Sequence, residues 1–397
     1  MVKTLIVVVA ARLSEWIEKG EITGGYFNPD GRFDRIFVVS LVEDTPSFDA
    51  VEQLCGVSDC HFVNLDCLSV SGLLRTVGFL PSRLKRLLLK SVAPLLSREE
   101  NVVVRSYGDT FSGMVAAILA NVLKCRSVAG IHTTFTYLPD GEKLSLKQKL
   151  LRVLEKRARD YTHKKIDVLA PVYSPVIHSI SPDQHHKTYV VPNSVDVGPD
   201  NKKTDYSFGA ALKVISVGRL VSGKTLIPVL EGLRTINEWH LTIVGDGPFK
   251  SCIETWLALH GLEEQVTFVK AMPNKELVNG LSQFDVFAAY TAYAEIPKTV
   301  IEAGLAGLPI ILNRPVLSMP DEYRDAPVLW AEGASPDYGT VFADFISRGD
   351  DWERTGRNTR NHFEKYFEPV TVGKMMADLL LEEPNDRLQP WNKDKNA

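Results

Sequence analysis

The chain has few cysteines, little net charge and no long hydrophobic run, and each shortage excludes a class of protein. Its 397 residues include five cysteines, an odd number without CxxC spacing, which disfavours a disulfide framework and structural zinc. A formal net charge of −4 gives no general reason to expect a nucleic-acid partner. No apolar run reaches the roughly 18–20 residues that span a bilayer, and no clean cleavage site follows the apolar stretch from Leu5 to Ala11. These absences predict a cytoplasmic protein.

Several catalytic motifs are absent as well. The sequence contains no HExxH, no GxxxxGK[ST] loop, no GxSxG elbow and no Asp-x-Asp pair for a metal-bound nucleotide. Metalloproteases, P-loop NTPases and serine hydrolases are therefore disfavoured.

The apolar runs that are present alternate with segments of helical period, which predicts parallel sheets covered on both faces. Strands are expected in a first half at Leu5–Val9, Ile36–Ser40, Val102–Arg105, Val128–Ile131, Ile166–Ala170 and Thr188–Val191. The polar, pattern-free stretch Gly198–Tyr206 is typical of a linker. A second α/β domain follows, with strands expected at Lys213–Val217, Leu241–Val244, Val266–Val269, Asp285–Ala289 and Pro309–Leu312. Two amphipathic helices, Asp351–Phe367 and Val370–Leu381, end the pattern.

In the first half, two features lie where ligands gather in such folds. Gly24-Gly25 lies in a long loop after the first strand, where glycine lets backbone approach a ligand closely. His132 directly follows the strand that ends at Ile131. Taken alone, such a loop is more often a surface turn, and a lone histidine is more often structural.

Two stretches of the first half are locally basic. Arg83, Lys85, Arg86 and Lys90 interleave with leucines, and Lys147–Lys165 carries only two acids, Glu155 and Asp160. Such helices either bind an anionic membrane surface or an acidic acceptor, or are ordinary solvated faces. We therefore keep peripheral membrane contact as one hypothesis.

In the second half, Gly218 opens a loop whose cations, Arg219 and Lys224, follow a strand. A guanidinium and an ammonium could together hold a diphosphate without a metal. The later sequence Gly245-Asp-Gly-Pro248 matches only part of a dinucleotide fingerprint and is weak evidence for NAD.

The stretch Ala294–Leu312 predicts a short helix between Pro297 and Gly307 that runs into a buried strand. Its free amides near Lys298 and Thr299 would suit a phosphate. Spacing places Glu302 near one helical face with Glu295 and Thr299, where a carboxylate could accept hydrogen bonds from sugar hydroxyls. The alternative is a packed helix with a solvated glutamate.

Together these stretches resemble the retaining glycosyltransferases of family GT4, which have the GT-B fold. The resemblance is carried in order by VISVGRLVSGKTLIPVLEGL, LTIVGDGP, VTFVKAMPNKEL, FDVFAAY and IPKTVIEAGLAGLPII. In the first half, KGEITGGYFNPDGRFDRIFVVSL, GIHTTF and VVPNSVD are similar to the corresponding family stretches.

The resemblance implies two Rossmann-like α/β domains that face each other across a cleft. The first, residues 1–197, would bind the acceptor and would be completed by a returning helix and tail at about 368–397. The second, residues 206–367, would bind a nucleotide-sugar donor.

The resemblance also implies a role for each candidate residue. Arg219 and Lys224 would grip the donor diphosphate beside Gly218, Lys298 and Thr299, and Gly24-Gly25 would approach the phosphates. Glu302 would accept the ribose hydroxyls, the backbone near Met272 would read the base, and His132 would lie near the reacting sugar.

One position departs from the family pattern. The family places a first glutamate eight residues before the second, but Ala294 stands there and the nearest acid, Glu295, is one residue late. Either a shorter loop lets Glu295 reach the sugar, or Glu295 points away and the backbone replaces it.

The implied activity is transfer of a hexosyl group, with retained configuration and no required metal or other cofactor, to a glycan, lipid-linked or small-molecule acceptor. Two alternatives keep the fold: a non-catalytic nucleotide-sugar-binding subunit, which Ala294 motivates, and a nucleotide-sugar epimerase, which would need no acceptor.

Overall fold

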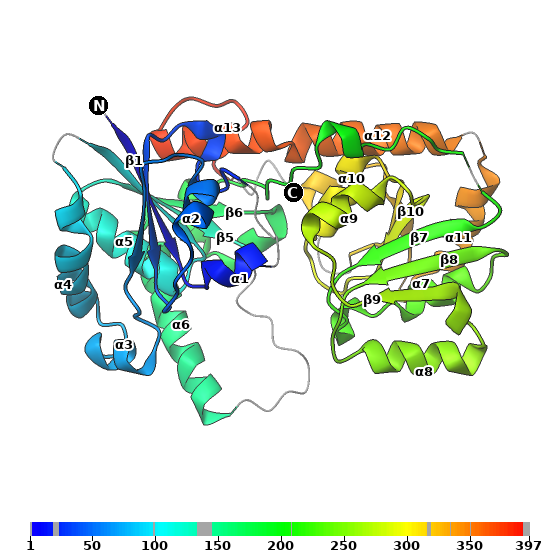
Figure 1. Ribbon diagram of the computed structural model, residues 1–397, viewed down its shortest axis with the longest axis horizontal. Helices are drawn as coiled ribbons and strands as arrows, with labels where there is room; N and C mark the ends of the chain where they lie inside the picture. Colours follow the sequence, from blue (N-terminus) through cyan, green and yellow to red (C-terminus); the bar gives the residue numbers. More distant parts are fainter. Residues whose placement is uncertain are drawn as a thin grey trace. The chain divides into compact units, whose positions relative to one another are not determined.

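The computed structural model describes residues 2–18, 24–97, 100–132, 145–207, 209–315, 319–333, 335–349 and 351–391. The chain divides into two compact units: Met1–Pro192 with Val372–Ala397, and Asn193–Thr371. Figure 1 colours both along the sequence, and the red end of the chain belongs to the first unit.

The first unit is built on a six-stranded sheet in the order β3-β2-β1-β4-β5-β6, and each pair is parallel. Val7 of the central strand lies opposite Val38 on one side and Arg105 on the other. The strands are β1 (Lys3–Val9), β2 (Arg35–Ser40), β3 (Cys60–Asn64), β4 (Asn101–Tyr107), β5 (Arg126–Ile131) and β6 (Val168–Pro171). The helices are α1 (Leu13–Glu18), α2 (Phe48–Cys55), α3 (Val70–Arg75), α4 (Pro81–Ser91), α5 (Phe111–Leu123), α6 (Leu146–Lys165) and α13 (Pro369–Leu381).

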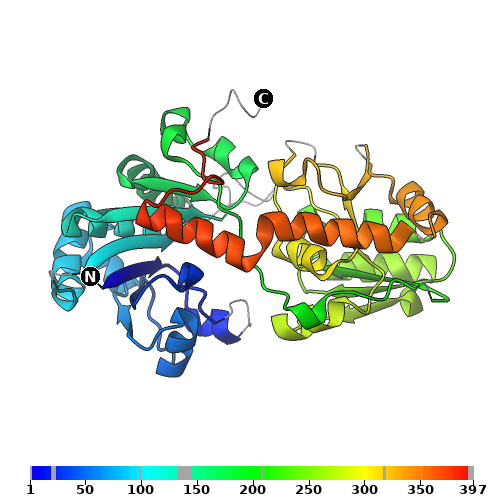
Figure 2. The ribbon, with the colours of Figure 1, turned by 90° about the horizontal axis from the view of Figure 1, so that it is seen from above.

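Both faces of this sheet are covered, as the unbroken apolar run of β1 requires. Leu5 and Val7 share a core with Met375 and Leu379 of α13, which lies along the sheet in Figure 2. Helix α5, buried through most of its length, packs against β4, β5 and β1. The end of the chain thus completes the first unit.

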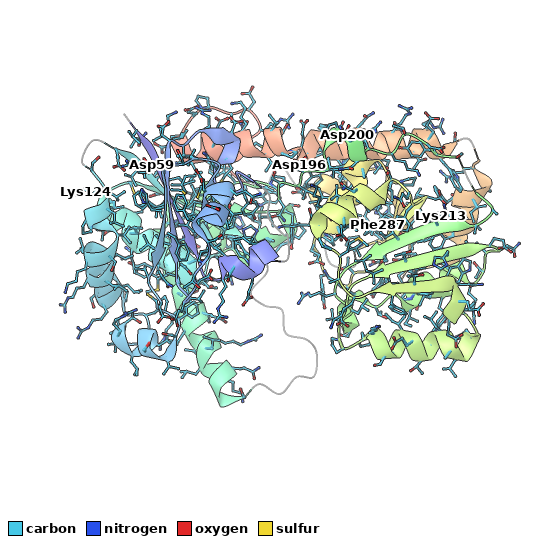
Figure 3. The ribbon with its side chains drawn as sticks, viewed as in Figure 1. Asp59, Lys124, Asp196, Asp200, Lys213 and Phe287 are labelled. Carbon is cyan, nitrogen blue, oxygen red and sulfur yellow. The ribbon has the colours of Figure 1, made fainter. Side chains whose placement is uncertain are left out.

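The second unit contains another six-stranded sheet of parallel pairs, in the order β12-β11-β10-β7-β8-β9. Figure 3 labels Lys213 on β7 and the fully buried Phe287 on β10, the two strands that pair at its centre. The strands are β7 (Leu212–Val217), β8 (Trp239–Val244), β9 (Val266–Val269), β10 (Val286–Ala289), β11 (Ile310–Asn313) and β12 (Leu329–Ala331). The helices are α7 (Ile227–Leu233), α8 (Lys250–His260), α9 (Asn274–Leu281), α10 (Lys298–Ala306), α11 (Tyr338–Ser347) and α12 (Asp351–Phe367).

The two sheets have the same winding. Each begins at an inner strand, β1 or β7, proceeds outward through two strands, and then returns to the other side of the first strand as β4 or β10. The loops after these inner strands leave in opposite directions and form the crevice in which open α/β sheets bind ligands. The predicted fold of two doubly wound α/β domains is confirmed.

Three local expectations differ from the structure. The edge strands β3 and β12 were not expected, and Thr188–Val191 forms only an isolated bridge from Thr188 to Leu169. The stretch Gly198–Tyr206 is packed on the second unit and is not a solvated linker. Lys203 is buried there, where its amide donates to Ala306 O, and the Tyr206 hydroxyl donates to Gly307 O. The nearby Asp196 and Asp200 are labelled in Figure 3.

Candidate active site

The loop after β7 carries Gly218, Arg219 and Lys224, and a second glycine loop fixes its path. A Cβ at Gly245 would lie 1.9 Å from Gly218 O, and one at Gly247 would lie 2.2 Å from Leu220 O. Only glycine allows this approach, and both residues also have positive φ. The partial dinucleotide fingerprint therefore serves loop packing. Gly218 and the Arg219 side chain are exposed.

Lys224 lies in an ion pair with Glu295, its Nζ 2.5 Å from Glu295 Oε1. Both side chains are about four-fifths buried, and the Thr291 hydroxyl lies 3.4 Å from the same carboxylate oxygen. The ring of Tyr293 occupies the space that a side chain at Gly223 would need, and Ala292 N donates to Gly223 O. A backbone hydrogen bond and an ion pair thus connect the loops after β7 and β10. Glu295 lies before the start of α10. The prediction that Glu295 shares a helical face with Glu302 is therefore wrong.

The N-terminus of α10 faces the end of β7. Pro297 is the N-cap residue and no side chain caps the helix, while Gly307 ends it with φ 88°. The Thr299 hydroxyl donates to Val217 O at 3.1 Å, which fixes the start of α10 beside Gly218. Because no side chain caps the helix, the backbone amides at its start could bind an anion.

Glu302, in the second turn of α10, is a buried carboxylate with one free oxygen. Its Oε1 accepts a 2.7 Å hydrogen bond from Asn274 Nδ2, whereas buried Oε2 has no partner among the described residues. Burial raises the pKa of Glu302 to about 7, against the opposing effects of Asn274 and the Lys298 charge. The alternative of a solvated glutamate is wrong. A buried acceptor without a donor is suited to a ligand hydroxyl.

The loop between β9 and α9 contains half-buried Met272, and Asn274 is the first residue of α9. Asn274 was not among the predicted site residues, because an asparagine at a helix start is ordinarily a cap. Its bond to Glu302 joins this loop to α10. The loop after β7, the start of α10, Glu302 and the Met272 loop thus form one connected site in the second unit.

His132 and Gly24-Gly25 belong to the first unit, where aromatic side chains connect them. The His132 ring stacks on Tyr107 with centroids 5.7 Å apart and planes 6° apart. Tyr107 also contacts Tyr26, which follows Gly25. Gly130 makes room for the histidine, since a Cβ there would lie 3.3 Å from His132 Nε2. Gly25 is in the left-handed region with φ 74°, and its amide donates to Gln53 O.

Behind this aromatic cluster lies a buried ionic cluster that the sequence did not indicate. Asp109, just after β4, accepts from Arg159 Nε at 3.0 Å and lies 2.8 Å from His163 Nε2. Burial alone would raise the pKa of Asp109, but His163 and Arg159 outweigh it and hold the pKa below its usual value. Arg159, on α6, also donates to Ser179, so the cluster links α6 to the segment after β6.

The described residues contain neither a candidate metal site nor a candidate membrane span. No group of three or more His, Cys, Asp or Glu side chains could hold a metal ion in this part of the chain. No helix within the described ranges is long and apolar enough to cross a membrane.

Comparison with known families adds a finding for the second unit. Residues 201–362 match the family Glycosyl transferases group 1. The matched segment runs from the stretch before β7 into α12 and so contains Arg219, Lys224, Met272 and Glu302.

Two curated proteins are similar to shorter pieces of the chain. The amylovoran biosynthesis glycosyltransferase AmsK of Erwinia amylovora is 30% identical over 110 residues, 25% of this chain and 27% of that protein. The 2-deoxystreptamine glucosyltransferase of Streptomyces kanamyceticus is 32% identical over 68 residues, 17% of this chain and 18% of that protein. The chain thus spans about a quarter or less of these relatives.

Solved structures share the fold over almost the whole chain. Anabaena Alr3699/HepE in complex with UDP and glucose superposes with a TM-score of 0.66 at 13% identity, covering 96% of this chain and 100% of that one. Sucrose-phosphate synthase from Thermosynechococcus elongatus gives 0.63 at 14% identity, covering 96% and 99%. These likenesses confirm the expected two-domain GT-B fold.

Proposed function

We propose that this chain is a retaining, GT4-like glycosyltransferase that moves a hexosyl group from a nucleotide-diphosphate sugar to a carbohydrate or lipid-linked acceptor. The observation that carries the proposal is Glu302, whose free carboxylate oxygen is buried beside the uncapped start of α10 in a segment that matches group 1 glycosyl transferases. A pair of ribose hydroxyls would supply the donors that this oxygen lacks.

The remaining groups of the second unit suit the rest of a donor. Arg219 and Lys224 would bind the diphosphate with the first amides of α10, because two cations and a helix N-terminus favour the same anion. The backbone around Met272 would contact the base. Lys224 is already paired with Glu295, so the diphosphate would compete with that carboxylate for the ammonium.

The proposed reaction breaks the bond between the anomeric carbon and the diphosphate oxygen. The acceptor hydroxyl forms the new bond on the same face, and its proton passes to a phosphate oxygen of the departing diphosphate. Negative charge grows on that diphosphate, so Arg219, Lys224 and the α10 amides would stabilise the transition state. We propose that these cations replace a divalent metal, and that His132 borders the reacting sugar.

Uridine is the first base to test. HepE was solved with UDP and with UDP-glucose, and one curated relative is named a glucosyltransferase. Both facts support a hexosyl donor on a uridine diphosphate.

The deciding experiment measures the thermal midpoint of the full chain with UDP, GDP, ADP and TDP and their sugar conjugates. One nucleotide should raise the midpoint, and Arg219→Ala should abolish that rise, since ligand binding to the folded state alone stabilises it. Arg234→Ala is the matched control, because Arg234 is a half-exposed arginine of the same unit paired with Glu231.

The outcomes separate the candidates. A rise that Arg219→Ala removes, with diphosphate release only when acceptor is present, supports transfer. Turnover without acceptor would assign an epimerase, and binding without turnover on any acceptor would assign a non-catalytic subunit. No rise with any nucleotide would contradict the donor site.

A further inference from the structure

The donor site leaves unused a face of the first unit where large apolar side chains are exposed. We call it the α3–α4–α6 face; it comprises Val70–Leu89 and the first half of α6. Val70 and Leu74, one helical turn apart on α3, are 76% and 74% exposed. Most exposed large hydrophobic side chains of the described residues lie on this face: Val70, Leu74, Val77, Leu80, Leu89, Leu150, Leu151 and Val153.

The same face is strongly basic. The stretch 67–97 contains no aspartate or glutamate, and its cations are Arg75, Arg83, Lys85, Arg86 and Lys90. Leu84 and Leu88 anchor α4 in the core, which leaves all four of its cations exposed. Arg83, Lys85, Arg86 and Lys90 form no salt bridge within the described ranges, although ion pairs are frequent elsewhere on the chain. No described carboxylate pairs with these four charges, so they can bind an external anion.

The turn between α3 and α4 lies next to α6 and packs on α5. A Cβ at Gly78 would lie 4.0 Å from Leu154 Cδ2, and Phe79 is buried against Phe111 with centroids 4.6 Å apart. Leu150 and Leu151 lie about one turn before Leu154 on α6. In the view of Figure 1, α4 is drawn above α3.

The backbone of this turn holds an apolar side chain outward at a conformational cost. Val77 has φ 50° and Phe79 has φ 66°, a region that side chains other than glycine rarely adopt. Burial of the Phe79 side chain offsets the conformational cost at that residue, whereas Val77 is 53% exposed. Residues in strained conformations cluster at functional sites, so the turn is a candidate functional surface.

We propose that the α3–α4–α6 face docks the protein on an anionic lipid bilayer. Val70, Leu74 and Val77 would enter the interface between headgroups and acyl chains, while the arginines and lysines of α4 and α6 would bind lipid phosphates. Branched aliphatic side chains favour this occupant over single-stranded nucleic acid, whose binding surfaces combine cations with aromatic rings. The proposal is independent of the donor site, which lies in the second unit.

Flotation of the full chain with vesicles tests the proposal. Vesicles of phosphatidylcholine with phosphatidylglycerol should carry the protein, and vesicles of phosphatidylcholine alone should not. Binding should weaken as salt rises, because each cation acts through a screened field. Equal binding to both vesicles, or no binding to either, would overturn the proposal.

Three variants locate the surface. Arg83→Glu with Arg86→Glu should lower vesicle partitioning by roughly tenfold or more, given the contribution of each cation near a charged surface. Leu74→Glu should lower it as well. Leu259→Glu is the matched control, since Leu259 is 78% exposed on α8 of the second unit, and its binding should equal that of wild type.

Thermal midpoints with and without UDP show whether each variant is folded and keeps its donor site. All four substituted side chains in these three variants are exposed, so these values should not change. Equal losses in Leu74→Glu and Leu259→Glu would reject this face as the docking surface. Binding to single-stranded RNA that equals binding to anionic vesicles would assign the face to nucleic acid instead.

Discussion

The two units share one strand order but place different chemistry at the crevice it creates. In the second unit, the loops after β7 and β10 are tight, glycine-packed and ionic, with Lys224 paired to Glu295. In the first unit, the corresponding region is aromatic, with Trp16, Tyr26, Tyr107 and His132 in contact through Tyr107. The winding of a sheet thus sets where a site can form, and the loops decide what it can bind.

Each unit also buries a carboxylate near this crevice, and their partners differ. Asp109 is satisfied by Arg159 and His163, whereas Glu302 has a single neutral donor and one oxygen left over. A fully paired carboxylate stabilises its unit, while a half-paired one is kept at a cost in stability. We therefore expect the two groups to respond in opposite ways to mutation and to pH.

The largest effect is expected in the first unit. Asp109→Ala should lower the free energy of unfolding by roughly 3–5 kcal/mol, because it removes the carboxylate that pairs with the largely buried Arg159 guanidinium and that His163 Nε2 contacts. Urea titration of the first unit's unfolding measures the change. Asp59→Ala, which removes a half-exposed partner of Arg35, should cost under about 1 kcal/mol. Similar losses in both variants would contradict the assignment of Asp109 as a buried structural ion.

The tight loops of the second unit predict the next effect. Gly247→Ala should destabilise that unit by roughly 3 kcal/mol, because its Cβ would meet Leu220 O and its φ is 155°. Gly25→Ala in the first unit is the control. Gly25 also has positive φ, 74°, but nothing lies within 4 Å of its Cβ, so about 1 kcal/mol is expected. Equal costs would show that the loops do not differ in packing.

Glu302 should make the second unit less stable as pH rises. With a folded pKa of about 7 and an ordinary unfolded value of about 4.3, the folded state binds the extra proton between these values. The contribution of Glu302 to the free energy of unfolding is therefore greatest below about pH 4.3, and it decreases as the pH rises to about 7. Glu302→Gln should remove this slope and raise stability at pH 8 by roughly 2–3 kcal/mol. Asp109 acts oppositely, since its depressed pKa gives stability that is lost as pH falls.

The smallest effect concerns the ion pair between Lys224 and Glu295 in the second unit. Glu295→Gln should raise the affinity for a nucleoside diphosphate by about threefold, because a partly exposed carboxylate no longer competes for Lys224. Calorimetric titration with UDP measures the change, and Lys224→Ala should weaken binding instead. A fall in affinity for Glu295→Gln would mean that Glu295 itself contacts the donor.

Strands with long apolar runs were predictable from the sequence, and short edge strands were not. β1 and β5 are buried on both faces, so their composition identifies them. The strands β3, with sequence CHFVN, and β12, with three residues, lie at sheet edges and carry polar or half-exposed side chains. They therefore lack the continuous apolar run that identifies a buried strand.

For the candidate site, motif spacing predicted Arg219, Lys224, Lys298 and Glu302, but it did not predict the neighbours that the structure gives to the site residues. Asn274 as the partner of Glu302 depends on the approach of α9 to α10, which no local pattern encodes. The pairing of Glu295 with Lys224 depends on how the loops after β7 and β10 approach each other. The Thr299 hydroxyl donates a hydrogen bond to Val217 O at the end of β7, which local sequence does not indicate either. Such partners follow from tertiary structure alone.

Because α13 supplies Val372, Met375, Met376, Leu379 and Leu380 to the core of the first unit, that core needs both ends of the chain. During synthesis on the ribosome, the strands of the first unit emerge early. Their core cannot be completed until α13, more than 350 residues after β1, has been synthesised. The second unit, made from one uninterrupted segment, can reach its native packing before the first unit does. The half that is translated first is therefore the half that finishes folding last.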